Sequence, residues 1–201
     1  MNHQKERTYT QRKFENHVAV PIIQTGSLFV FDWKNKNGSG EYAIRYYLDQ
    51  EKGNLMITGD VGSSIASWGN PLTPKGVYSL LGNISYYMEK IQCSGNRYTY
   101  HQEDVDTDID ALEKDLIAQG FPEEEIRIDI ETIRFFYADH IITEDSLLSD
   151  EITDLFEHYD PCWYDNPQFT TIGRRIDTRI VLWVEGFRMA CEQMGICKVK
   201  K

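Results

Sequence analysis

The stretch LFVFDWKNKNGSGEYAIRYYLDQEKGNLMITGDVGSSIASW, residues 28–68, decides the fold. Short apolar and aromatic runs are separated in it by turns rich in Gly and Asn, which is typical of successive β-strands. In residues 41–49 the side chains alternate, with Ile44 and Tyr46 on one face and Arg45 on the other, as in a half-buried strand. Four strands joined by short connections predict an antiparallel meander.

The segment GDVGSS, residues 59–64, has the glycine content of a phosphate-binding loop. A Walker-type loop requires Lys and then Ser or Thr after its last glycine, with a helix behind it. Here Gly62 is followed by two serines and by strand-like alternation, and no lysine comes before Lys75. We therefore interpret this segment as a hairpin turn.

After the strands the apolar period becomes helical. Thr73 suits an N-cap and Pro74 the first helical position, and apolar residues then recur at helical spacing over 77–91. This predicts one helix of about five turns that covers a face of the sheet. Beyond residue 103, further apolar stripes predict helices, the last of them over 176–194. The predicted fold class is α+β: a four-stranded antiparallel meander packed by a helix, followed by an acidic, mainly helical half.

These patterns also predict how the chain is organised. Residues 1–26 are polar and are expected to form an arm or a short helix. Residues 27–201 are expected to form a single α+β domain, with the sheet and its helix in 27–102 and the helical half in 103–201.

The composition indicates the kind of partner. The chain has 201 residues and a formal charge of −11, so DNA, RNA and anionic lipid repel it and a basic partner attracts it. No apolar run is long enough to cross a membrane, and the polar start lacks the apolar core of a signal peptide. We therefore expect a cytoplasmic protein. Its four cysteines are too unevenly spaced for a zinc site or a disulfide framework.

Acidic residues are concentrated between positions 103 and 131, where twelve acidic side chains face two basic ones. A calcium loop is one explanation, because Asp104, Asp106, Asp108 and Asp115 have EF-hand-like spacing, although Ile109 stands where the turn needs Gly. A solvated helix face is the second explanation. The third is a phosphate-like surface that binds a basic groove. The residue pattern leaves all three open.

The loop EHYDPCWYDNPQFTTIG, residues 157–173, carries a weaker signal. His158, Asp160 and Cys162 alternate in it, which would suit a metal or a Cys/His pair if the backbone brought them together. The turn-forming Asp-Pro step explains the segment equally well. We expect no metal site and no cofactor.

The run from FVFDW through YAIRYYLD and NLMITGDVGSSIASW to LLGNISYYMEKIQCSGNRYTYHQED resembles a group of small phage-encoded proteins of Gram-positive bacteria. Some members of that group are similar to type II-A anti-CRISPR proteins, which inhibit Cas9. The resemblance covers about residues 28–104 and includes no catalytic motif. It implies that the chain binds Cas9, or its complex with guide RNA, and blocks target DNA binding or cleavage.

The resemblance implies a role for the acidic stretch, because Cas9 holds nucleic acid in basic channels. Trp163 and Tyr164 would serve as aromatic anchors, although buried structural aromatics are the alternative for both. Arg174, Arg175 and Arg179 would contact exposed guide RNA, unless they pair with the acidic residues or cap helix charge. No sequence-specific DNA contact and no membrane contact are implied. The carboxylates expected to contact Cas9 are Asp104, Asp106, Asp108, Asp110, Glu123, Glu124 and Glu125.

Two other functions remain open. A metal-dependent nuclease or nucleotide-processing enzyme would use the many aspartates as ligands, although no pairing of nucleophile and base is recognisable. A phage accessory protein with another host target is the second. The distribution of the acidic side chains, on an open surface or converging in a cleft, discriminates between a binding protein and an enzyme.

Overall fold

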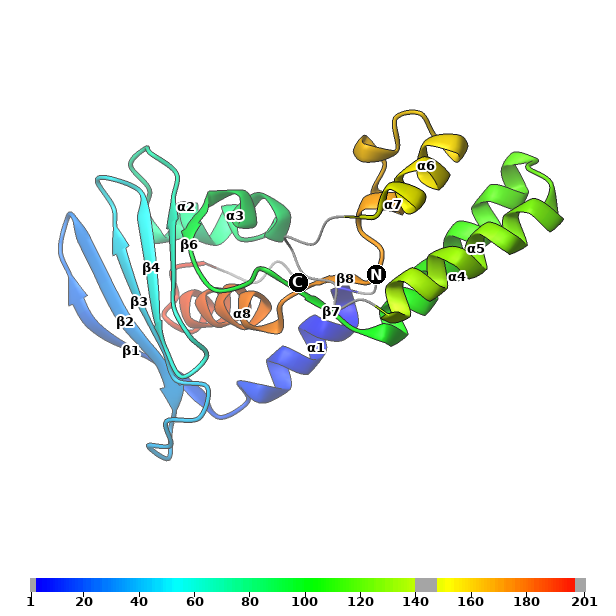
Figure 1. The fold of residues 1–201 in the computed structure, drawn as a ribbon. Helices are drawn as coiled ribbons and strands as arrows, with labels where there is room; N and C mark the ends of the chain where they lie inside the picture. Colours follow the sequence, from blue (N-terminus) through cyan, green and yellow to red (C-terminus); the bar gives the residue numbers. More distant parts are fainter. Residues whose placement is uncertain (1–2, 140–147, 198–201) are drawn as a thin grey trace. The chain divides into compact units, whose positions relative to one another are not determined.

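The structure, a computed structural model, describes residues 3–139 and 148–197 (Figure 1). The chain divides into two compact units. The first, here called the sheet unit, comprises residues 3–97 and 177–197 as described, and the second, the helical unit, comprises residues 98–139 and 148–176. We describe each unit by itself.

The sheet unit contains a six-stranded antiparallel meander in the order β1 to β6, which confirms the predicted α+β class and its meander. The four predicted strands are β2 to β5, and the structure adds one strand at each edge. β1 falls within the expected polar arm; it pairs with β2 through a register shift between Pro21 and Ile23, as suits a Pro-containing edge strand. The strands are β1 (His17–Gln24), β2 (Leu28–Asn35), β3 (Ile44–Asp49), β4 (Asn54–Gly59), β5 (Ser64–Ser67) and β6 (Ile91–Cys93).

The GDVGSS segment is the connection between β4 and β5. Gly62 has φ +91° and its N–H donates to the carbonyl of Gly59 over 3.1 Å. Strand β5 follows directly and pairs antiparallel with β4, so the prediction of a hairpin turn is confirmed.

One face of the sheet packs against α8 (Thr178–Gln193). The helix approaches closely because Gly186 has no side chain: a Cβ there would lie 2.5 Å from the hydroxyl of Tyr46. That buried hydroxyl donates to the carbonyl of Trp183 over 2.8 Å, and Phe187 packs against the rings of Phe31 and Tyr46. Helix α1 (His3–Lys13) also packs on α8.

The five-turn helix expected after the sheet is two helices, so that prediction is corrected. Helix α2 (Pro74–Leu80) begins at the predicted cap, where the hydroxyl of Thr73 accepts from the N–H of Gly76. The chain then turns, and the side chain of Asn83 caps a second helix, α3 (Ile84–Lys90), by accepting from the N–H of Tyr86. Gly82 and Asn83 are poor helix formers, because Gly loses the most backbone entropy in a helix and the Asn side chain hydrogen-bonds nearby backbone groups instead. This explains the break at residues 82–83.

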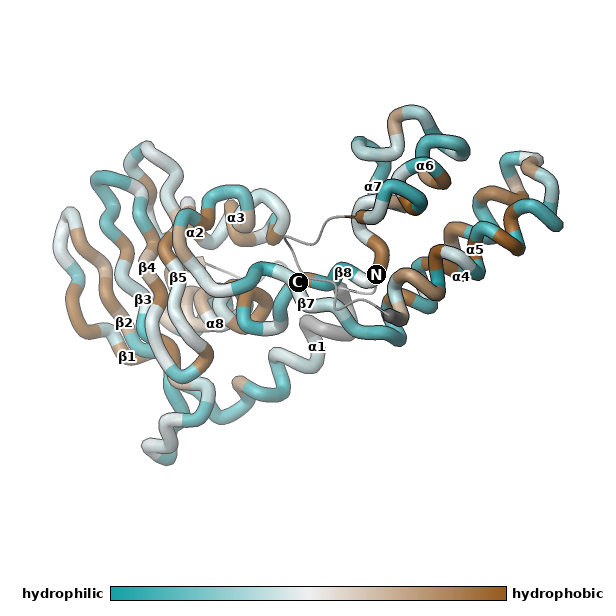
Figure 2. The backbone as a smooth tube through the Cα atoms, viewed as in Figure 1, coloured by the Kyte–Doolittle hydropathy of each residue, from teal (hydrophilic) through white to brown (hydrophobic). Residues whose placement is uncertain are grey.

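The helical unit is built on α4 and α5, with hydrophobic residues recurring along both helices (Figure 2). The predicted stripes are buried, including Ile109 and Leu112 of α4 and Ile126 and Ile130 of α5, and Gly120 ends α4 in the left-handed conformation. The mainly helical half is thus confirmed. The elements are β7 (Tyr98–Tyr100), α4 (Gln102–Gln119), α5 (Glu123–Asp139), α6 (Asp150–Tyr159), the 3-10 helix η1 (Trp163–Asp165), α7 (Pro167–Thr170) and β8 (Arg174–Ile176).

The division into units differs from the expected one in two respects. Strand β7 lies within the range expected to form the sheet and its helix, but it pairs with β8 in a separate two-stranded sheet. Helix α8, expected in the helical half, returns to the sheet unit because its apolar side chains, Trp183 and Phe187 among them, are buried there.

Candidate interaction surface

The two units carry opposite charge. Residues 98–176 contain 21 acidic and five basic residues, a formal charge of −16, whereas the rest of the chain contains 11 acidic and 16 basic residues, a formal charge of +5. The acidity of the protein therefore belongs to the helical unit. Some of its carboxylates are engaged within the fold, and others face solvent.

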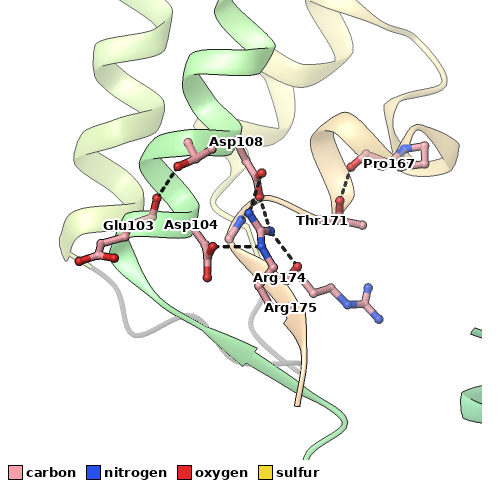
Figure 3. A network of polar contacts seen from close by, with 9 residues as sticks. Glu103, Asp104, Asp108, Pro167, Thr171, Arg174 and Arg175 are labelled. Carbon is pink, nitrogen blue, oxygen red and sulfur yellow. Dashed lines mark hydrogen bonds and ion pairs between the residues drawn. The ribbon is translucent and has the colours of Figure 1, made fainter. Parts of the chain in front are cut away.

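The carboxylates of Asp104 and Asp108 lie on one side of α4, where they hold Arg175 of β8 (Figure 3). The carboxylate of Asp108 accepts hydrogen bonds from Nη1 of Arg175 at 2.7 Å and from Nη2 at 2.9 Å. It also accepts one from the backbone N–H of Gly173 at 2.9 Å. Asp104 lies 3.1 Å from Nε of the same arginine. We call these two carboxylates the Arg175 pair.

The Arg175 pair is part of the fold. The side chain of Arg175 is only 16% exposed, and the hydrogen bonds of its guanidinium to Asp108, opposed by burial, raise its pKa above the ordinary value. Asp115, also on α4, accepts a hydrogen bond from the side chain of Gln168 of α7. These contacts attach β8 and α7 to α4, so the carboxylates that make them are not available to a partner without loss of the contact.

A second set of carboxylates on α4, Asp106, Asp110 and Glu113, converges on Arg134 of α5. We call these three residues the Arg134 row. Asp110 makes the direct ion pair, whereas Asp106 and Glu113 lie 3.9 and 4.0 Å from the guanidinium. Asp106 and Asp110 are more than half exposed. One arginine thus faces three carboxylates, and the row keeps an excess of negative charge at the surface.

Three of the carboxylates expected to contact Cas9, Glu123, Glu124 and Glu125, lie in the first turn of α5, where the helix dipole favours negative charge. Glu124 pairs with Arg127 at 2.7 Å and Glu125 with His158 at 3.0 Å. Both pairs are exposed to solvent, where such contacts contribute little to stability. All three glutamates are therefore accessible to a partner.

The two predicted aromatic anchors lie in different environments. Trp163 is partly buried and packs against the core of the helical unit, with its ring 5.7 Å from that of Phe156, which is close to the alternative of a buried structural aromatic. Tyr164 is 61% exposed and is the accessible member of the two.

Two exposed apolar side chains of α5 were not singled out by the sequence patterns. Phe135 is 73% exposed and Ile128 is 60% exposed. Both line an open groove of about 1080 Å³, together with residues that include Arg127, Glu131 and Glu151. Their spacing of seven residues places them on one face of the helix. The sequence contained a signal for this surface, because two apolar residues at helical spacing lie outside the apolar stripe that forms the core.

The three arginines assigned to RNA contact are each engaged within their own unit. Arg175 holds the Arg175 pair, and the guanidinium of Arg174 lies 3.5 Å from the centre of the Tyr98 ring. Arg179 belongs to the sheet unit, where it bonds Asp177 at 2.8 Å and the carbonyl of Asn96 at 3.0 Å. Burial acts to raise the pKa of Asp177, but the hydrogen bonds from Arg179 hold it below its ordinary value. Arg175 and Arg179 thus pair with acidic residues, which was the alternative to RNA contact.

The calcium-loop explanation is contradicted by the structure. Asp104, Asp106, Asp108 and Asp115 lie on one continuous helix, and a helix cannot wrap its ligands around an ion as an EF-hand loop does. Nor are His158, Asp160 and Cys162 brought together: His158 reaches Glu125, whereas Asp160 accepts from Asn166 and from the N–H of Cys162.

Within residues 3–139 and 148–197 no group of three or more His, Cys, Asp or Glu residues is placed to hold a metal ion. Among the same residues, no helix has the length and apolar character to cross a bilayer. Comparison of the chain with family models, with curated proteins and with solved structures found no match.

Proposed function

We propose that this chain is a binding protein that inhibits Cas9, occupying a basic channel of the Cas9–guide RNA complex with its acidic helical unit and blocking target DNA binding or cleavage. The observation that carries the proposal is the concentration of charge: −16 within 79 residues, against +5 in the remainder. A unit with this charge is drawn to a positive partner from a distance.

The density of exposed carboxylates supports this proposal. The Arg134 row extends over eight residues of α4, with about 10 Å of helix axis between its first and last members, so its three carboxylates are on average roughly 5 Å apart along the axis. One strand of DNA carries a phosphate about every 3.4 Å of axis. Glu123, Glu124 and Glu131 of α5 add further exposed charges to the helical unit. A groove lined by arginines would meet charge at a spacing close to that of its own ligand.

Exposed apolar side chains within the helical unit complete the proposed contact. Phe135 and Ile128 of α5, and Tyr164 of η1, provide apolar area that would be buried on binding and would hold the partner after electrostatic attraction has brought it close. The Arg175 pair is excluded from the contact, because Asp104 and Asp108 hold β8 in place. The proposed contact residues are Asp106, Asp110, Glu123, Glu124, Glu125, Glu131, Ile128, Phe135 and Tyr164.

A target-DNA binding and cleavage assay tests the proposal, using type II-A Cas9 proteins loaded with guide RNA. The test variant carries Asp106→Asn, Glu123→Gln, Glu124→Gln and Glu131→Gln, four exposed carboxylates among the proposed contact residues. The matched control carries Glu15→Gln, Glu41→Gln, Glu51→Gln and Glu89→Gln, four exposed carboxylates of the sheet unit. Both variants change the formal charge from −11 to −7.

We expect the wild-type chain and the control to inhibit, and the test variant to lose inhibition. Equal inhibition by both variants would show that net charge or another surface is responsible. Absence of inhibition by the wild-type chain with every Cas9 tested would overturn the proposed function.

A further inference from the structure

The sheet has a face without a covering helix in the part of the sheet unit that the structure describes. Helices α2, α3 and α8 lie on the same side of the sheet in Figure 1, and α8 packs on the side to which Phe31, Ile44 and Tyr46 contribute. Residues of opposite parity along the strands, such as Val30 and Tyr47, therefore point to the other face. We call this the outer face.

A row of mainly apolar residues crosses the outer face. The register joins Ile23 to Val30, Val30 to Tyr47, Tyr47 to Met56, Met56 to Ile65 and Ile65 to Cys93. The row thus includes one residue from each of the six strands and spans about 24 Å. Ile23, Met56 and Ile65 are each about 40% exposed.

Polar residues border this apolar row on both sides. On one side, Asp32 accepts from Arg45 over 2.9 Å, and Arg45 pairs in register with Thr58. On the other side, Asp49, Asn54 and Ser67 are in register. The solvent face of an antiparallel sheet normally alternates to polar residues. An apolar centre within a polar border is the composition of a protein–protein interface.

The charged residues in the polar borders indicate which partner would cover the outer face. Arg45 and Asp49 lie two residues to either side of Tyr47 on β3, so a two-fold axis along the apolar row places Arg45 of one copy opposite Asp49 of the other, twice in each dimer. Thr58 and Asn54 are placed about Met56 in the same way. Arg45 has five N–H donors, of which Asp32 takes two. The outer face is therefore complementary in charge to itself.

We propose that two copies of this chain associate through their outer faces, with the apolar rows in contact across a two-fold axis. The two sheets would pack about 10 Å apart, as in a β-sandwich, and would bury Met56 and Ile65 of each copy. This inference is independent of the proposed function, because it concerns the sheet unit and not the acidic helical unit.

Light scattering coupled to gel filtration tests the association, over concentrations from micromolar to about 100 μM, where interfaces of this kind are populated. The test variant is Ile65→Lys, with Met56→Lys as a second, independent variant. The matched control is Ile117→Lys on α4, because Ile117 and Ile65 are the same residue type and are both 39% exposed. Circular dichroism verifies that each variant is folded.

We expect the wild-type chain and Ile117→Lys to reach twice the monomer mass as concentration rises. Ile65→Lys and Met56→Lys should raise the dissociation constant at least about tenfold, because a lysine ammonium would be buried in the contact. A wild-type chain that stays monomeric at the highest concentration would overturn the proposal. So would a dimer that survives both substitutions in the row, or one that is lost in Ile117→Lys.

Discussion

Arg175 of β8 and Asp108 of α4 form a two-pronged ion pair, with nitrogen–oxygen distances of 2.7 and 2.9 Å, across 67 positions of the sequence. Because Asp104 and Asp108 are bound to Arg175, they hold the helical unit together. Other carboxylates of the acidic stretch, such as Asp106 and Asp110, face solvent. This division determines which acidic residues are proposed as contacts for a partner.

Replacing Arg175 should loosen the helical unit. Arg175→Gln leaves Asp104 and Asp108 without their cation in a site where the arginine is 16% exposed, which should cost about 1–3 kcal/mol of local stability. Hydrogen exchange of the α4 and β8 amides measures this loss. Arg127→Gln is the control, because its pair with Glu124 is exposed on both sides and should contribute less than about 0.5 kcal/mol. Equal protection in the two variants would contradict the structural role of Arg175.

Adding a methyl group at Gly186 should destabilise the sheet unit, although alanine is the better helix former by about 1 kcal/mol. The new Cβ would lie 2.5 Å from the Tyr46 hydroxyl and 3.2 Å from Cδ1 of Trp33. We expect Gly186→Ala to cost about 1–3 kcal/mol in urea unfolding followed by tryptophan fluorescence.

Two further variants isolate the clash at Gly186. Tyr46→Phe removes the hydroxyl, so the double variant should be more stable than the sum of the single effects by at least about 0.5 kcal/mol. Gly76→Ala on α2 is the control, since its Cβ would lie 3.3 Å from the tip of the Leu72 side chain and 3.6 Å from the hydroxyl of Thr73, an ordinary contact. A more stable Gly186→Ala variant would show that helix propensity outweighs packing at this position.

The stability of the sheet unit should fall as the pH drops below 6.5 because of His17. The ring is 3% exposed and packs against Phe14 and Trp33, and burial lowers its pKa from 6.5. The unfolded chain therefore binds the proton more readily, so stability is present above pH 6.5 and decreases below it. His17→Phe should reduce the loss of urea stability between pH 7.5 and 5.5, whereas His101→Phe, at an exposed position, should not. An unchanged pH dependence in His17→Phe would contradict this assignment.

Salt should weaken binding of the proposed partner. Exposed charges such as those of the Arg134 row are screened as the Debye length falls from about 14 Å at 50 mM salt to about 7 Å at 200 mM. The affinity for the Cas9–guide complex should therefore fall several-fold over this range, mainly through slower association, as measured by surface plasmon resonance. The variant with four neutralised carboxylates in the helical unit should show a shallower salt dependence than the sheet-unit control. Equal slopes would remove the electrostatic part of the proposal.

Local patterns predicted the strands and helices well where the periodicity was strong. Alternation over residues 41–49 predicted β3, and the cap at Thr73 predicted the start of α2. The edge strands β1 and β6 were not predicted. Strand β1 contains Pro21 and strand β6 has only three residues, so neither shows a clear alternation of apolar and polar side chains. Their pairing depends on neighbours that a local pattern does not include.

The candidate contact residues were predicted less completely. The acidic stretch was recognised from charge alone, but the sequence could not separate Asp106 from Asp108, which lie two positions apart. On a helix this spacing points the two side chains in different directions, one toward Arg134 and the other toward Arg175. Both arginines are distant in sequence, so no local pattern distinguished the two aspartates.

The sequence by itself determined the α+β class, the antiparallel meander, the acidic helices and the position of the charge along the chain, because periodicity and charge are local properties that survive in any fold. The tertiary structure decided that α8 returns to the sheet, that Asp104 and Asp108 hold β8, and that an apolar row crosses the outer face. These features depend on contacts between residues far apart in the chain, and such contacts exist only once the backbone has folded.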